Sequence, residues 1–293
     1  MRWAAVALLA GLAQFSGSAD LAPARAGAAD TPVALELVLA LDRSESIDGS
    51  TLALQIDGHA RAFRDPRVIA AIAGGQDSGQ DSGQDSGPGG APPGRGIAVT
   101  VVTWSDPSDL QVLVPWTSVA RAEDALRLAA RIEAAPRLEP QGSTGLGSAL
   151  VEAAALFERN GFAAPRRVID IVGNGISNVG IPPQLARDRV IAREITVNGL
   201  AILDEVPWLG QYFADNVIGG PGAFVHVASD HDSFAQAILG KLETEIAAGE
   251  APPARHAAAG PQVRDARARD RLEMTGAHGP EGMAPKDRRW TNP

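Results

Sequence analysis

The sequence predicts an α/β domain with a mostly parallel sheet, helices on both faces of that sheet and one antiparallel edge strand. Apolar runs of strand length recur along the chain, beginning with VALELVLAL at 33–41. Stretches with helical spacing lie between the runs, and this alternation is typical of a parallel sheet covered on both faces. Two runs, at 96–104 and 109–116, are separated only by a short turn-forming stretch, which favours an antiparallel hairpin.

The elements follow from these patterns in chain order. The first run is apolar almost throughout, which predicts a strand buried on both faces. Apolar residues then recur at helical spacing from Leu52 to Phe63, and Asp48 or Ser50 is placed to cap that helix. Further helices are expected at Val119–Glu133, Leu146–Asn160, Pro183–Glu194 and Asp230–Ala247, and further strands at Val168–Val172, Thr196–Leu203 and Ala223–Val227.

The predicted domain covers residues 31–250, and three other segments differ from it in composition. Residues 1–26 have the layout of a signal peptide, with Arg2, an apolar run Trp3–Ala13 and small residues before a cleavage site. Residues 74–96 contain three Gly-Gln-Asp-Ser repeats and too few apolar side chains to fold, so we expect a flexible insertion. Residues 251–293, rich in Ala, Pro, Arg and Asp, are expected to form a disordered tail.

Charge and cysteine content exclude several classes of function. The formal net charge is -9, so nucleic acid and anionic membranes are poor partners. The absence of cysteine removes disulfides, thiolate metal sites and cysteine nucleophiles. Because 1–26 resemble a signal peptide and no second long apolar stretch follows, we expect a periplasmic or secreted product with no membrane insertion after cleavage.

Polar side chains collect where predicted strands end and where one predicted helix begins. These side chains are Asp42, Ser44 and Ser46 after the first strand, Thr144 before the helix near 146, and Asn174 after the strand at 168–172. Ligands of open α/β sheets bind at the carboxyl ends of the strands, so these residues can converge. All of them are oxygen donors, which suit Mg²⁺, and a site with few anionic ligands would attract a carboxylate from outside. A simpler alternative is that Ser44, Ser46 and Thr144 only cap helices.

Most enzyme motifs are incomplete in this chain. The segment GSTGLGS has Ser148 where a phosphate-binding loop requires lysine, and GNGISN lacks the third glycine of a dinucleotide-binding loop. His59 is expected to be a packed or surface residue and His231 to lie at a helix start. A phosphoesterase with Asp42 as nucleophile stays open because a strand-end aspartate with Mg²⁺ suits phosphoryl transfer. No matching lysine or second acidic cluster accompanies Asp42, however.

The strings LALDRSESID, STGLGSAL and VIDIVGNG, in this order and spacing, resemble the von Willebrand factor type A (vWA) domain and its metal-ion-dependent adhesion site (MIDAS). VTWSDPSDLQVLVPWT and NVIGGPGAFV are similar to a bacterial, exported vWA-like family of undefined function, so the resemblance covers about Val33–Ala247. It implies a Rossmann-like, doubly wound fold with one Mg²⁺ or Mn²⁺ at its top. Asp42, Ser44 and Ser46 match the Asp-x-Ser-x-Ser element of the family, and Thr144 matches its threonine.

The fourth element of the family motif is an aspartate within Gly-Asp-Gly, whereas this chain has Asn174 in GNG. A full charge about 4 Å from a divalent ion is worth several kcal/mol at an effective dielectric of about 20, before desolvation. We therefore expect weak cation binding. Arg43 and Glu45 alternate with the motif side chains, so we expect both to be exposed rim residues that tune the choice of partner.

These observations favour an exported, non-enzymatic binding module that engages an acidic side chain or C-terminus of a protein partner through the bound cation. Two alternatives stay open. One is the Mg²⁺-dependent phosphoesterase with Asp42 as nucleophile, and the other is a degenerate vWA scaffold that has lost its metal, as Asn174 would allow. The sequence indicates neither the partner nor the oligomeric state.

Overall fold

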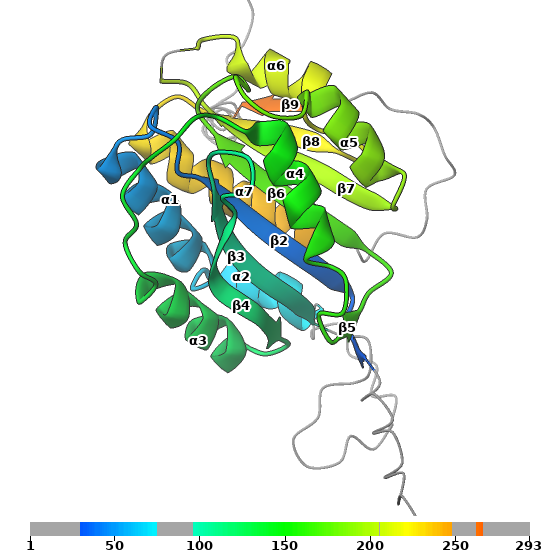
Figure 1. Cartoon of the computed structure of the whole chain (residues 1–293). Helices are drawn as coiled ribbons and strands as arrows, with labels where there is room; N and C mark the ends of the chain where they lie inside the picture. The colour runs from blue at the N-terminus through cyan, green and yellow to red at the C-terminus, as the bar shows by residue number, and fades with distance from the viewer. Residues whose placement is uncertain (1–29, 75–95, 205, 248–261, 266–293) are drawn as a thin grey trace, which may run out of the picture.

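The computed structural model describes residues 30–74, 96–204, 206–247 and 262–265 (Figure 1). Within them, a seven-stranded sheet has the strand order β4-β3-β2-β6-β7-β8-β9. Its strands are β2 (Leu35–Asp42), β3 (Ile97–Trp104), β4 (Gln111–Val119), β6 (Arg167–Gly173), β7 (Ile195–Ile202), β8 (Phe224–Ala228) and β9 (Gln262–Asp265). Two short strands, β1 (Thr31–Pro32) and β5 (Phe162–Ala163), form a separate parallel pair.

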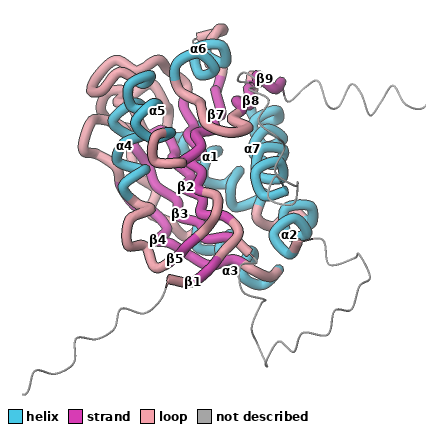
Figure 2. Tube along the Cα trace, turned by 90° about the vertical axis from the view of Figure 1, so that its right-hand side faces the viewer, coloured by secondary structure: helices cyan, strands magenta, loops and turns pink. Residues whose placement is uncertain are grey.

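Helices cover both faces of the large sheet (Figure 2). They are α1 (Gly49–Ala62), α2 (Pro66–Ala73), α3 (Ala122–Glu133), α4 (Leu146–Ala155), α5 (Pro183–Ile191), α6 (Leu209–Asn216) and α7 (His231–Ala247). In β2, Leu37 and Leu39 face one core, which includes side chains of α1, α2, α3 and α7. Val38 and Ala40 face a second core with side chains of α4, α5 and α6. This division is why β2 is apolar on both faces.

The strand order reverses at β2, and this reversal places the candidate site. Every neighbouring pair in the large sheet is parallel except β3 and β4, which form an antiparallel pair. The chain passes from β2 to β3 on one side, and β6 later pairs with the other side of β2. Connections after β2 and β6 therefore diverge, which opens a crevice at their carboxyl ends. The predicted fold class, including its antiparallel edge strand, is confirmed.

Five elements were not predicted from the sequence: α2, α6, β9 and the two-residue strands β1 and β5. Helices α2 and α6 each span eight residues, too short for a helical period to stand out in the sequence. Strand β9 lies within the expected disordered tail and pairs with β8 in parallel, so the expectation of a tail without regular structure does not hold for these four residues. The proposed signal peptide, nearly all of the 74–96 insertion and the rest of the tail lie outside the described residues.

No helix in the described part of the chain combines the length and the apolar character that crossing a bilayer requires.

A buried histidine in α1 predicts a pH-dependent stability. His59 is 2% exposed, and its Nδ1 lies 2.7 Å from the Gln55 carbonyl oxygen. The pKa of His59 is lowered to about 4, chiefly by burial and to a smaller extent by the charge of Lys241, while the hydrogen bond to the Gln55 carbonyl acts to raise it. Between about pH 6.5, its ordinary pKa, and about pH 4, the unfolded chain binds a proton that the folded chain does not. The free energy of unfolding should therefore fall by about 3 kcal/mol across this range on account of His59.

The test is urea unfolding of the wild type and of His59→Gln at pH 7 and pH 4. Gln can still donate a hydrogen bond but does not titrate, so the variant should lose about 3 kcal/mol less than the wild type on acidification. Comparing the two proteins cancels the contributions of their shared carboxylates. Equal pH dependence in both proteins would show that His59 is not the group responsible.

Candidate functional site

Asp42 is the last residue of β2 and is completely buried. Its Oδ1 accepts a hydrogen bond from the Ser44 backbone N–H at 2.8 Å. Its Oδ2 is buried and has no hydrogen-bond partner among the described residues. Burial raises the pKa of Asp42 to about 6, although the hydroxyl and N–H of Ser44 and the N–H of Asn174 act to lower it. A buried acid with one unpartnered oxygen is unfavourable as a carboxylate unless a positive charge is supplied.

The two motif serines and Asn174 form a short chain of hydrogen bonds beside Asp42. The Oγ atoms of Ser44 and Ser46 lie 3.0 Å apart. Ser46 Oγ donates to Asn174 Oδ1 at 2.8 Å, and Asn174 Nδ2 donates to the Ser46 carbonyl oxygen at 2.8 Å. Asn174 therefore contacts Ser46 with both of its polar side-chain atoms, and it joins the end of β6 to the loop after β2.

Thr144 reaches the same place from the start of α4. Its backbone N–H donates to Asn178 Oδ1 at 2.9 Å, and its carbonyl oxygen accepts from the Asn178 N–H at 3.1 Å. A Cβ atom added to Gly175 would lie 3.8 Å from both Ser46 Oγ and Thr144 Oγ1. A Cβ atom added to Gly173 would lie 3.2 Å from Asp42 Oδ2. Oxygens from two other segments, Asp42–Ser46 and the start of α4, therefore lie next to the end of β6.

The donor set fits a hard divalent cation. All five candidate residues offer oxygen, and all but Ser46 are at least nine-tenths buried. In the described ranges, no group of three or more His, Cys, Asp or Glu side chains could hold a metal ion. The candidate site lacks such a group because Asp42 is its single carboxylate. Its other donors are neutral hydroxyl and amide oxygens, an arrangement that Mg²⁺ tolerates when water completes its coordination shell.

Arg43 was expected to be exposed, and this expectation is wrong. Its exposed fraction is 2%. Its Nη2 lies 2.6 Å from Asp109 Oδ2, and its Nη1 donates to the Glu139 carbonyl oxygen at 3.2 Å. Strict alternation of side chains ends with β2 at Asp42, so it does not apply to Arg43. Glu45 is exposed, as expected.

Two groups of polar residues escaped sequence reasoning. Ser105, Asp106 and Asp109 were interpreted only as a turn, yet they contact the segment that carries Thr144. Lys241 and Glu245 fall within the helix predicted at Asp230–Ala247 and were not singled out, yet both are 1% exposed. For the first group, the sequence offered one signal, which was the position of Arg43 between two motif residues that face inward. The second group had none, because helical spacing does not reveal what the sheet presents to the helix.

A doubly wound sheet, with an Asp-x-Ser-x-Ser segment and a threonine at the carboxyl ends of its central strands, defines a vWA-like domain. The chain belongs to the family described as "Protein of unknown function (DUF1194)", whose sequence model matches residues 32–80 and 90–250. No curated protein matches the chain by sequence.

Solved structures of vWA-type proteins are similar to this chain in fold. Proximal thread matrix protein 1 from the mussel byssus, with a zinc-occupied MIDAS motif, has 17% identity and a TM-score of 0.50, with coverage of 75% of this chain and 50% of that chain. A von Willebrand factor type A protein from Catenulispora acidiphila has 14% identity, a TM-score of 0.45 and coverage of 74% and 43%. The pilus adhesin SpaC from Lactobacillus rhamnosus GG has 12% identity, a TM-score of 0.47 and coverage of 75% and 31%. The chain thus spans half or less of each of these structures.

Proposed function

We propose that this protein is an exported, non-enzymatic module that binds a protein partner through a divalent cation held by Asp42, Ser44, Ser46 and Thr144. The observation that carries the proposal is the buried Asp42 Oδ2, which has no hydrogen-bond partner among the described residues, although Oδ1 of the same carboxylate accepts from the Ser44 N–H. A cation is the partner that this oxygen lacks. Mg²⁺ or Mn²⁺, when bound, would supply an open coordination position for a carboxylate of the partner.

Each residue of the candidate site has a separate role in holding that cation. Asp42 supplies the single negative charge, and the Ser44 N–H orients its carboxylate through Oδ1. Ser44, Ser46 and Thr144 supply neutral oxygens, so the charge of the cation stays largely uncompensated. Asn174 positions the Ser46 hydroxyl with one hydrogen bond and the Ser46 backbone with another. An acidic partner is favoured because the protein compensates only part of the positive charge of the cation.

Exposed apolar side chains near the candidate site support a protein partner. Ile176 and Val179 lie in the loop after β6, and Trp208 precedes α6; all three are exposed. The Ser177 N–H donates to the Tyr212 hydroxyl at 3.2 Å, and the rings of Tyr212 and Trp208 lie 6.3 Å apart, edge to face. The loop and Trp208 therefore belong to one connected surface. Exposed apolar side chains grouped at a candidate site are typical of protein-binding surfaces, so we expect a partner with an apolar side chain next to its acidic one.

Two observations support export of the protein from the cytoplasm. The proposed signal peptide at 1–26 has a positive start and a short apolar run. Two of the similar structures are a byssus matrix protein and a pilus adhesin by name. The periplasm or the exterior of the cell is therefore the compartment in which we expect the partner.

The direct test of partner binding is a pull-down from envelope extract with the immobilised protein, in Mg²⁺ and in EDTA, followed by mass spectrometry. A partner retained in Mg²⁺ and lost in EDTA and with Asp42→Ala supports the proposal. Retention under all conditions supports instead the degenerate scaffold that binds by shape. Turnover of a generic phosphate ester that Asp42→Asn abolishes would favour the phosphoesterase.

The substitution Asn174→Asp should tighten Mg²⁺ binding. It restores the charge that the family motif has at this position, and we expect affinity to rise by about tenfold or more because a full charge near a divalent ion is worth several kcal/mol before desolvation. Isothermal titration calorimetry with MgCl₂ measures the effect. Asn216→Asp, at the end of α6, is the matched control because it adds the same charge outside the candidate site. Unchanged or weaker binding by Asn174→Asp would contradict the placement of Asn174 beside the cation.

A further inference from the structure

Arg43 contacts three segments although it lies between two motif residues. Its backbone N–H donates to the Trp104 carbonyl oxygen at the end of β3, at 2.9 Å. Its carbonyl oxygen accepts from the Gln141 N–H at 2.8 Å. Its guanidinium contacts Asp109 and the Glu139 carbonyl oxygen. Arg43 thus joins β2, the turn between β3 and β4, and the segment that leads to Thr144.

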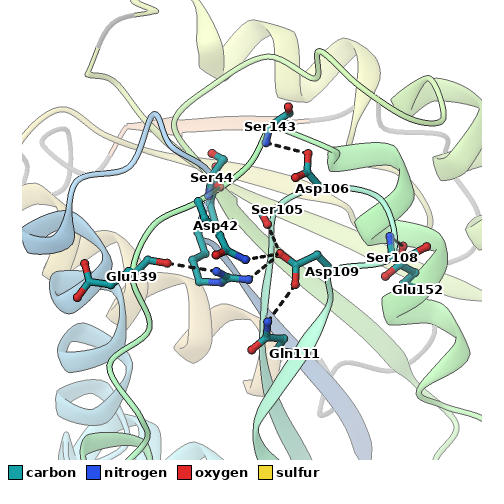
Figure 3. A network of polar contacts seen from close by, with 12 residues as sticks. Asp42, Ser44, Ser105, Asp106, Ser108, Asp109, Gln111, Glu139, Ser143 and Glu152 are labelled. Atoms are coloured by element: carbon teal, nitrogen blue, oxygen red, sulfur yellow. Dashed lines mark hydrogen bonds and ion pairs between the residues drawn. The ribbon is translucent and has the colours of Figure 1, made fainter.

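Asp109 is the centre of this network (Figure 3). Its Oδ2 contacts Arg43 and also accepts hydrogen bonds from Ser105 Oγ at 2.5 Å and from Gln141 Nε2 at 3.4 Å. Its Oδ1 accepts a hydrogen bond from Gln111 Nε2 at 3.0 Å. Burial acts to raise the pKa of Asp109, but these hydrogen bonds and the charge of Arg43 outweigh burial and hold the pKa below its ordinary value. Asp109 is therefore a carboxylate at neutral pH and forms a full ion pair with Arg43.

Residues 136–145, which carry Thr144, form neither helix nor strand. Their placement depends on hydrogen bonds to the segments on either side. These bonds are Glu45 N to Gly142 O (3.0 Å), Ser143 N to Asp106 Oδ1 (2.9 Å), Gly145 N to Ser105 O (2.8 Å) and the Gln141–Arg43 bond. Gly145 permits the close approach, since a Cβ at that position would lie 2.6 Å from the Ser105 carbonyl oxygen.

We propose that the Arg43–Asp109 ion pair is a positioning device that holds the Thr144 segment against the Asp42–Ser46 segment and thereby sets cation affinity. This inference rests on the proposed function. Asp42, Ser44 and Ser46 lie on one continuous segment, so their mutual placement is local. Thr144 comes from a different segment, and only contacts between segments place its hydroxyl beside theirs. Outer contacts of this kind commonly change metal affinity by about 10- to 100-fold.

Two variants test the Arg43–Asp109 pair, so that a result is obtained even if one of the variants does not fold. Arg43→Met removes the buried cation and leaves Asp109, whose side chain is 23% exposed, with its three other hydrogen-bond donors. Arg43→Met combined with Asp109→Asn removes both charges together, so neither remains buried without a partner. Arg64→Met is the matched control, because Arg64 pairs with Glu133 at the surface, beyond the far end of α1 from the motif.

The first measurement is hydrogen exchange in EDTA, which is independent of any cation. In Arg43→Met and in the double variant, the amides of Glu45 and Gln141 should exchange about tenfold faster than in the wild type. The amide of Leu39, in the middle of β2, should exchange at the wild-type rate in both, which shows that the sheet is intact. Arg64→Met should leave all three rates unchanged.

The second measurement is Mn²⁺ binding by titration calorimetry, at a temperature where every variant is fully folded. Arg43→Met and the double variant should bind Mn²⁺ about 10- to 100-fold more weakly than the wild type, and Arg64→Met should bind normally. Arg43→Lys should give an intermediate affinity, because an ammonium group restores the charge but not the planar shape with which the guanidinium contacts two groups at once.

Faster exchange together with weaker Mn²⁺ binding supports the proposal. Faster exchange with unchanged affinity would mean that the pair contributes stability alone, and unchanged exchange would mean that it does not hold the segment; either result overturns the proposal. Should the wild type itself bind no Mn²⁺, the proposed function fails, and the exchange rates still decide separately whether the pair orders the segment.

Discussion

Replacing Lys241 with alanine should lower the free energy of unfolding by about 3–5 kcal/mol, as expected when one partner of a buried ion pair is removed. Lys241 lies in α7 and is 1% exposed. Its Nζ is 2.8 Å from Glu245 Oε1 and forms an ion pair with Asp170 of β6. Asn198 Nδ2 of β7 donates to the same Glu245 oxygen at 2.8 Å. Without the lysine, two carboxylates stay buried together with no cation between them.

Urea unfolding followed by circular dichroism measures this loss. Arg64→Ala is the control, because the Arg64–Glu133 pair is exposed and its removal should change stability by less than about 1 kcal/mol. A triple variant, Lys241→Met with Asp170→Asn and Glu245→Gln, removes all three charges and should recover much of the lost stability. A loss of under about 1 kcal/mol for Lys241→Ala would contradict the buried network.

Asp42→Asn should change stability in opposite directions with and without the cation. In EDTA at pH 7, burial makes the Asp42 carboxylate unfavourable, as the raised pKa of about 6 indicates. Asn keeps an acceptor for the Ser44 N–H without the charge, so the variant should be about 1–2 kcal/mol more stable than the wild type. With Mn²⁺ at a hundred times its Kd, the wild type should gain about 2.7 kcal/mol and the variant almost nothing.

Thermal unfolding in EDTA and in MnCl₂ measures both effects on the same samples. The order of the two melting temperatures should reverse when Mn²⁺ is added. Asp48→Asn is the matched control in the same segment, since Asp48 caps α1 through the Thr51 N–H and Asn is an equally good cap. Asp48→Asn should respond to Mn²⁺ as the wild type does. A melting temperature of Asp42→Asn below that of the wild type in EDTA as well would mean that the Asp42 carboxylate is stabilised by a contact other than the cation.

The pattern of apolar residues was sufficient to predict most of the fold. The eight residues of β2 are all buried, and helices α1, α3, α4, α5 and α7 begin within three residues of the positions that spacing and caps predict. These elements are long, or apolar on a clear face, so local sequence specifies them. Strand β9 and helices α2 and α6 are short, and they depend on surfaces that other parts of the chain provide.

Local spacing along the chain was enough to show which oxygens lie at strand ends and helix starts. The sequence also indicated that Asn174 would replace a charge. The folded chain was needed to show that Asn174 contacts Ser46 with both polar atoms, that Arg43 turns inward to Asp109, and that Lys241 contacts two buried carboxylates. Apart from the Lys241–Glu245 pair within α7, these contacts join residues far apart in the chain. A charged side chain carries no local sign of whether its partner will be water or another segment of the protein.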